Sequence, residues 1–216
     1  MAFSIGPPSI IGNNLILYWD VSNPNSYPGT GTTIYDLSEN GNNGTLVNGV
    51  SYSSTNGGVL VFDGNDDYVF SNTPNLTSSN YTIMGAARYS GATRGRIINA
   101  TSNNWLMGHW NNSTENYYAE GWVSSVQAGT SDTNWRIYAS NGNISGDSYG
   151  FYVNNNFVVQ NNNGSAGPNG ITLGRFALNS SEYSTAQFSF LLMYDRILTT
   201  TEMTQIFNMN RGRFGI

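Results

Sequence analysis

The chain has 216 residues and a net charge of −5, and only 10% of its residues are charged. Cys is absent, which excludes a disulfide framework, a thiolate nucleophile and a Cys-ligated zinc site. All eight basic residues are scattered arginines and no apolar run could span a bilayer, so we expect neither nucleic-acid binding nor membrane insertion.

The first 14 residues have the pattern of an extended arm. Apolar side chains surround a Gly-Pro-Pro sequence that fits neither a helix nor a central strand: Phe3, Ile5, Ile10 and Ile11. The segment lacks the positively charged start of a signal peptide, so we expect none, and hence a protein that stays inside or leaves by lysis. We divide the chain into this arm, residues 1–14, and a single domain, residues 15–216.

Strand-like runs follow the arm at short, regular intervals. They are rich in aromatic and β-branched residues and are separated by turn residues, a pattern typical of an all-β sandwich. The predicted strands are 15–20, 58–63, 67–71, 81–89, 96–100, 105–110, 116–124, 135–140, 148–153, 157–160, 171–176 and 187–194. Asn-Gly pairs accept positive φ and therefore predict tight turns, at 40–41, 43–44, 48–49, 56–57, 141–142, 163–164 and 169–170.

One helix is predicted near the C-terminus. Thr199 can cap it, because Glu202 stands three residues later and completes a capping box. Apolar residues then follow at helical spacing and predict a face that lies on the sandwich: Met203, Ile206 and Phe207. Arg211-Gly212 supplies the stop.

Several motifs, in order, resemble one known family. Tyr18-Trp19-Asp20, the run from Tyr35 to Leu46, and Val61-Phe62-Asp63-Gly64 resemble the opening of laminin-G-like domains. Leu173-Gly174-Arg175 resembles a late strand of that family, and the run from Met193 to Glu202 resembles its closing strand and terminal helix. The resemblance covers residues 15 to about 210. It implies a concanavalin A-like (laminin-G-like) jelly-roll β-sandwich of two antiparallel sheets with one short C-terminal helix, a fold used mainly for binding.

A narrower resemblance concerns the source of the protein. The run from Tyr27 to Thr33 and the ending Gly212–Ile216 are similar to versions found in virion structural proteins of tailed phages, notably cyanophages. That resemblance implies a virion location, with capsid or tail subunits as partners. We expect the arm, with Phe214, to anchor the domain to such a partner by burying Phe3, Ile5 and Ile10. A homo-oligomer is a further alternative, because sandwiches expose edge strands that can pair with a second copy.

Enzyme activity is not expected. A retaining glycosidase needs two carboxyl groups about 5–5.5 Å apart, which glucanases of this fold supply from alternating positions of one strand. None of the five glutamates has an acidic residue two positions away: Glu39, Glu115, Glu120, Glu182 and Glu202. His109 could act as a base, but no Gly-x-Ser-x-Gly elbow accompanies it. A glucan hydrolase with unfamiliar residues stays a remote alternative.

A calcium site is the one metal site that the sequence suggests. Asp63, Asp66 and Asp67 bring three carboxylates within five residues, and calcium takes six to eight oxygen ligands. The resemblance adds that many relatives hold a calcium near the sandwich rim. The spacing matches no specific calcium loop, so we favour a solvated polar hairpin turn between two strands. No cofactor is required on either interpretation.

Carbohydrate binding would use exposed aromatic rings. The densest aromatic segment runs from residue 105 to 122 and supplies the candidate residues Trp105, His109, Trp110, Tyr118 and Trp122. Tyr118 and Trp122 share a face under the two-residue alternation of a strand. For each residue, core packing is the favoured alternative.

The sequence therefore predicts a non-enzymatic virion structural or decoration protein whose lectin-like sandwich binds cell-surface glycans weakly. The alternative is a free-standing lectin or adhesin.

Overall fold

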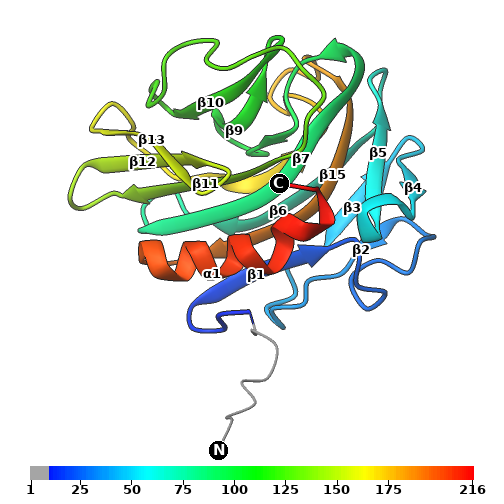
Figure 1. The fold of residues 1–216 in the computed structure, drawn as a ribbon, viewed down its shortest axis with the longest axis horizontal. Helices are drawn as coiled ribbons and strands as arrows, with labels where there is room; N and C mark the ends of the chain where they lie inside the picture. The colour runs from blue at the N-terminus through cyan, green and yellow to red at the C-terminus, as the bar shows by residue number, and fades with distance from the viewer. Residues whose placement is uncertain (1–9) are drawn as a thin grey trace, which may run out of the picture.

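The computed structural model describes residues 10–216 and contains two antiparallel sheets packed face to face (Figure 1). The eight-stranded sheet has the order β13 (Asn156–Asn161), β12 (Ser148–Val153), β11 (Arg136–Asn143), β7 (Tyr81–Arg94), β15 (Ser184–Tyr194), β5 (Val59–Asp63) and β4 (Ser51–Ser53), and β1 (Leu15–Asp20) also pairs with β15. The seven-stranded sheet has the order β10 (Ser113–Ala119), β9 (Trp105–Trp110), β8 (Ile98–Asn99), β14 (Asn169–Leu173), β6 (Tyr68–Asn75), β3 (Gly44–Val47) and β2 (Thr33–Ile34). The predicted all-β sandwich is confirmed.

The main core lies between the two sheets. Residues that pair across an antiparallel ladder point to the same face. One such row of the seven-stranded sheet is apolar and fully enclosed: Tyr117, Met107, Ile98, Leu173, Val69 and Leu46. This row crosses the sheet from β10 to β3 and faces the core. The opposite face of the seven-stranded sheet is therefore its outer face.

A second core lies on the opposite side of the eight-stranded sheet. There α1 (Thr200–Asn210) buries Met203 and Ile206 against Met84, Phe190 and Leu192. The predicted capping box is present, since Thr199 Oγ1 accepts from the Glu202 amide (3.2 Å) and Glu202 Oε2 accepts from the Thr199 amide (2.8 Å). The helix thus forms a third layer, visible beside β1 in Figure 1.

The C-terminus closes this second core. Phe214, just after the short 3₁₀ turn η2 (Arg211–Arg213), is buried, and its ring centroid lies 4.6 Å from that of Trp135. Ile10 and Ile11 pack against the same cluster. The prediction that a partner buries Phe214 was wrong, because Phe214 is already buried within this chain, whereas Ile10 is only partly buried and its predicted role stays a prediction. Residues 1–9 of the predicted arm, including Phe3 and Ile5, lie outside the described residues.

Most predicted strands are present, and 15–20, 105–110 and 148–153 match in both bounds. Three short strands were missed: β2, β3 and β4. Three of the Asn-Gly pairs predicted as turns contribute residues to strands instead, and one of them, 169–170, begins β14. Gly44 lies in β3, where an added Cβ would approach the Trp19 ring to 2.8 Å, and Gly142 lies in β11 against the Tyr81 ring. These glycines serve close packing.

The polar segment after β5 is not a hairpin turn. β5 belongs to the eight-stranded sheet and β6 to the seven-stranded sheet, so residues 64–67 cross between the sheets. Among residues 10–216, no helix is long and apolar enough to cross a membrane.

Candidate functional site

Two of the five predicted sugar-binding residues are interior. Trp105 and His109 are fully buried, because both belong to the inward-facing set of β9. Trp105 donates from Nε1 to Tyr81 Oη (3.2 Å) in the core. Their assignment to a surface site was therefore wrong, and the aromatic richness of this strand fills the sandwich interior instead.

His109 is held in the core as a neutral group. Its ring stacks edge-on between Tyr89 and Tyr138, with centroids at 4.6 and 5.3 Å. Burial lowers the pKa of His109 to about 3, and the nearby Arg136 charge acts in the same direction. The Nδ1 atom has no hydrogen-bond partner among the described residues. A histidine so enclosed cannot touch a ligand at the surface.

The other three predicted residues do come together, on the surface. The Trp122 ring lies 5.0 Å from that of Trp110 and 5.1 Å from that of Tyr118, between centroids. All three side chains are partly exposed. Tyr118 belongs to β10 and Trp110 ends β9, while a backbone bridge to Tyr118 holds Trp122 in place. We call Trp110, Tyr118 and Trp122 the aromatic cluster.

The aromatic cluster stands at one end of the outer face of the seven-stranded sheet. The cross-strand row that begins at Tyr118 continues through the next strands, as Leu106, Asn99, Thr172, Phe70 and Thr45. Phe70 and its face-mate Tyr68 form a second aromatic pair, with ring centroids 5.9 Å apart. Aromatic side chains therefore stand at both ends of this face.

A loop crosses the middle of the face. We call residues 174–183 the covering loop. Two backbone hydrogen bonds hold it to the segment that follows β7. The Gly95 amide donates to the Tyr183 carbonyl (3.1 Å), and the Arg96 amide donates to the Glu182 carbonyl (2.9 Å). Asn99 and Thr172 are buried although they face outward. Asn99 Nδ2 donates to the carbonyls of Thr172 (2.9 Å) and Arg175 (2.6 Å).

A hollow of about 530 Å³ adjoins the aromatic cluster on one side of the covering loop. It is lined by Trp110 and Asn111 from the end of β9, by Arg94 from the end of β7, and by Glu182 and Tyr183 from the loop. We call it the Arg94 hollow. Its mixture of an indole ring, a cation and several neutral hydrogen-bonding groups suits a polar ligand with apolar faces.

Glu182 is the organising group of the Arg94 hollow. It accepts from Arg96 Nε (2.6 Å) and from Trp110 Nε1 (3.2 Å), which fixes the indole beside the carboxylate. Arg96 is buried, with its guanidinium carbon 3.8 Å from the Phe176 ring centroid. Burial lowers the pKa of Arg96 below its usual value, while the Glu182 charge acts in the opposite direction.

A smaller hollow of about 220 Å³ lies on the other side of the covering loop. Tyr68, Phe70 and Arg175 line it, together with the hydroxyls of Thr101 and Thr172. We call it the Arg175 hollow. The sequence pattern did not single out these residues, because Arg94, Arg175 and Tyr68 come from segments far apart in the chain. The two-residue alternation along β6 was the available signal for the Tyr68–Phe70 pair.

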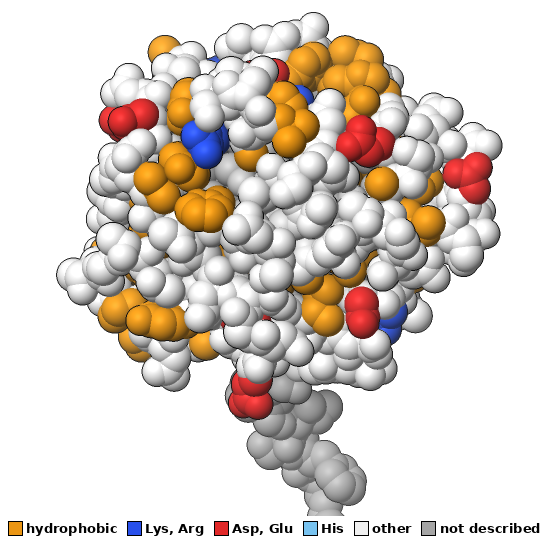
Figure 2. Space-filling model, turned by 180° about the vertical axis from the view of Figure 1, so that it is seen from behind, with side chains coloured by type: hydrophobic (Ala, Val, Ile, Leu, Met, Phe, Trp, Pro, Cys, Tyr) orange, Lys and Arg blue, Asp and Glu red, His pale blue; other side chains and the backbone are white. Residues whose placement is uncertain are grey.

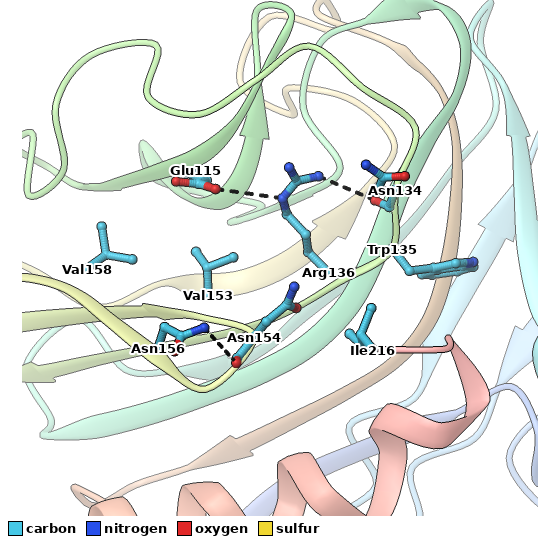
Figure 3. A pocket seen from close by; sticks show the side chains of 9 residues that line it. All are labelled: Glu115, Asn134, Trp135, Arg136, Val153, Asn154, Asn156, Val158 and Ile216. Atoms are coloured by element: carbon cyan, nitrogen blue, oxygen red, sulfur yellow. Dashed lines mark hydrogen bonds and ion pairs between the residues drawn. The ribbon is translucent and has the colours of Figure 1, made fainter.

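A third hollow lies near the C-terminus (Figure 3). Arg136 reaches into it, but Asp132 binds its guanidinium at 2.7 and 2.9 Å, and Glu115 lies 3.9 Å away. In Figure 3 the Trp135 indole points away from Arg136. The charges here are already paired, so this hollow offers a ligand less than the outer face does.

The three aspartates of the predicted calcium site do not form one. Both Asp67 carboxylate oxygens accept from the Asp63 amide, at 3.0 and 3.1 Å. The Asp63 carboxylate in turn accepts from the Asn65 amide (2.8 Å). Burial raises the pKa of Asp67 to about 7. Within residues 10–216, no three acidic or His side chains converge on a point that could hold a metal ion. The residues, including Asp66, therefore do not fit a calcium site.

No protein-family model matches the sequence, and neither does any curated protein. Solved structures do resemble the fold. The binding domain of Paraclostridial Mosquitocidal Protein 1 has a TM-score of 0.66 at 16% identity, over 90% of this chain and 52% of that one. The botulinum neurotoxin serotype D ligand binding domain, in complex with N-acetylneuraminic acid, has a TM-score of 0.66 at 13% identity, over 92% and 51%.

Domain 4 of AbnA, an extracellular arabinanase of Geobacillus stearothermophilus solved with arabinotriose, has a TM-score of 0.64 at 13% identity, over 91% of this chain and 98% of that one. The present chain thus spans about half the length of the two toxin domains and nearly the whole of the arabinanase domain. These likenesses show the fold: the chain is a β-sandwich of the architecture found in these domains.

Proposed function

We propose that this protein is a non-catalytic carbohydrate-binding domain whose site is the outer face of the seven-stranded sheet. The observation that carries the proposal is the aromatic cluster. Trp110, Tyr118 and Trp122 are gathered at the surface, and Trp110 also lines the polar Arg94 hollow. Large rings of this kind are usually buried unless a partner covers them.

The chemistry of the face matches that of a sugar. A pyranose ring has apolar C–H faces that pack on an indole, and hydroxyls that require hydrogen-bond donors and acceptors. The Arg94 hollow offers Asn111, Tyr183 and Arg94 beside the Trp110 ring. The Glu182 bond to the Trp110 indole holds the ring in one orientation, which reduces the entropy lost on binding. Similar folds solved with arabinotriose and with N-acetylneuraminic acid support the proposal.

A glycan array tests it. We expect wild-type protein to bind a defined set of glycans in the micromolar range, and Trp110→Ala and Trp122→Ala to weaken that binding about tenfold or more, because each removes a stacking surface. Phe157→Ala is the matched control, since Phe157 is 60% exposed on β13 of the other sheet. EDTA should leave binding unchanged. Equal binding by the tryptophan variants would contradict the proposal.

We propose no catalytic step for this face. Glu182, the carboxylate of the Arg94 hollow, is engaged by Arg96 and Trp110. Glu120 accepts from the Asn104 amide (2.7 Å), and Glu115 faces Arg136. A retaining glycosidase would need two free carboxyl groups facing one substrate. Release of reducing sugar from laminarin by the purified protein would contradict this part.

We further propose that the domain is carried on a phage particle as a decoration or structural protein. Support comes from the sequence resemblance of residues 27–33 and 212–216 to virion proteins, and from the surface. Figure 2 shows a face that is largely neutral and carries few charged side chains. Deleting residues 1–9 tests the anchoring role: we expect loss of incorporation into particles at unchanged melting temperature. Undiminished incorporation would overturn it.

A further inference from the structure

Arginine is the only cationic side chain type at neutral pH in this chain, so the partners of its eight guanidinium groups can be followed one by one. Among the described residues, four form ion pairs with carboxylates: Arg96, Arg136, Arg196 and Arg213. Of the other four, Arg94 and Arg175 each line a hollow beside the outer face of the seven-stranded sheet: Arg94 from the end of β7 and Arg175 from the covering loop. In a protein of net charge −5, this is an unusual place to leave two cations without carboxylate partners.

Arg94 is held in position but not neutralised. Its Nε donates to the Gly91 carbonyl (2.8 Å) and its Nη1 to Ser131 Oγ (2.5 Å), while its guanidinium carbon lies 5.5 Å from the Tyr89 ring centroid. Both hydrogen-bond partners are neutral. A guanidinium has five N–H donors, and the bonds to Gly91 and Ser131 use two of them. The Nη2 edge has no partner among the described residues.

Arg175 is held in the same way. Its guanidinium carbon lies 3.4 Å from the Tyr68 ring centroid, and its Nη1 donates to Ser180 Oγ (3.1 Å) and Tyr183 Oη (3.4 Å). Its Nε is buried and has no hydrogen-bond partner within the described chain. Because this Nε atom is enclosed, a ligand would meet Arg175 through its Nη groups.

The two hollows are neighbours. Tyr183 lines the Arg94 hollow, and its hydroxyl accepts from Arg175 on the other side of the covering loop. Tyr183 therefore links the Arg94 hollow to the Arg175 guanidinium. Glu182, the carboxylate that lines the Arg94 hollow, is already paired with Arg96 at 2.6 Å, so it does not cancel the charge of Arg94.

We infer that the outer face of the seven-stranded sheet takes an acidic saccharide chain, one whose residues carry carboxylate or sulfate groups; this inference rests on the proposed function. One acidic group pairs with Arg94 while its sugar ring packs against Trp110, and a further acidic group pairs with Arg175 beside Tyr68. A guanidinium presents parallel N–H donors that match carboxylate and sulfate oxygens, and it discriminates against a neutral hydroxyl.

The test compares three oligosaccharides on the full-length chain by isothermal titration calorimetry: hexagalacturonate, the same chain with its carboxyls reduced, and a sulfated form of the reduced chain. We expect at least one acidic chain to bind about tenfold or more tightly than the reduced chain, with an affinity that falls as salt is raised. The carboxylated and sulfated arms identify which acidic group is preferred. Arg94→Gln and Arg175→Gln should each remove most of that preference, because each weakens binding of the acidic chain far more than binding of the reduced chain.

Arg211→Gln is the matched control, because Arg211 is exposed, has no Asp or Glu partner among residues 10–216 and lies in η2, beside the second core rather than the outer face of the seven-stranded sheet. Equal loss in the Arg211 and Arg94 variants would overturn the inference, since net charge alone would then explain the binding. Equal affinity for acidic and reduced chains would also overturn it, while a loss in Trp110→Ala would still uphold the proposed function. Binding that Trp110→Ala leaves intact for every chain would overturn both. Thermal melts confirm that each variant is folded.

Discussion

At the scale of single residues, the largest difference between expectation and structure concerns the segment from residue 105 to 122. Alternation along a strand assigns its aromatic side chains to two faces, but it does not say which face is covered. Trp105 and His109 lie inward, and Trp110 and Tyr118 lie outward. The sequence could therefore show that this segment contains both surface and core aromatic residues. It could not say which residues belong to which, because that depends on how the two sheets pack.

His109 gives the protein a measurable acid sensitivity. Its pKa is about 3 in the folded chain and about 6.5 when unfolded. Between these values the unfolded state binds a proton that the folded state does not, so the free energy of unfolding falls as pH is lowered, by up to about 1.4 kcal/mol per pH unit. Asp67, whose pKa is raised to about 7, acts oppositely between about pH 4 and 7.

Chemical denaturation from pH 7 to pH 4 isolates the His109 contribution. We expect His109→Gln, which cannot be protonated, to have a lower free energy of unfolding than wild type at pH 7. The difference between the two proteins should become smaller as pH falls, because only wild type loses stability through His109. In Asp67→Asn, which removes the opposing group, acid should destabilise the protein more steeply than in wild type. A constant difference between wild type and His109→Gln across this range would show that His109 is protonated equally in both states.

At the scale of elements, the chain shows where local signals suffice. The helix was predicted from its capping box, and the strands with both bounds correct begin or end at clear turn residues. β2, β3 and β4 were missed because each is at most four residues long and lies in sequence dominated by Asn, Gly, Ser and Thr. Gly44 shows the reason: it serves close packing against Trp19, which no local pattern reveals.

Thr199 tests the capping argument at this scale. Replacing it with Ala removes the acceptor for the Glu202 amide and should lower the free energy of unfolding by about 1 kcal/mol, whereas Thr199→Ser should retain most of it. Urea denaturation measures both. The Glu202 carboxylate also pairs with Arg196 at 2.6 and 3.0 Å, so the helix should stay attached in either variant. Equal losses in the Ala and Ser variants would contradict the capping role.

At the scale of the whole molecule, the sequence predicted a two-sheet sandwich but not which strands share a sheet. Residues 63–67 read as a hairpin turn and a candidate calcium site, yet they cross from one sheet to the other, and the crossing directs Asp67 inward. The covering loop, which brings Glu182 and Arg175 to the face occupied by Trp110 and Phe70, is likewise set by sheet order. The candidate site is a property of that assembly.

The five tryptophan indole N–H groups report directly on the claim that the outer face of the seven-stranded sheet binds glycans. Trp110 and Trp122 lie on that face, whereas Trp19, Trp105 and Trp135 are buried elsewhere. In a ¹⁵N–¹H correlation spectrum titrated with a glycan selected by the array, we predict that the indole signals of Trp110 and Trp122 shift progressively and that the other three stay in place. A shift confined to Trp135, or no indole shift at saturation, would contradict the account.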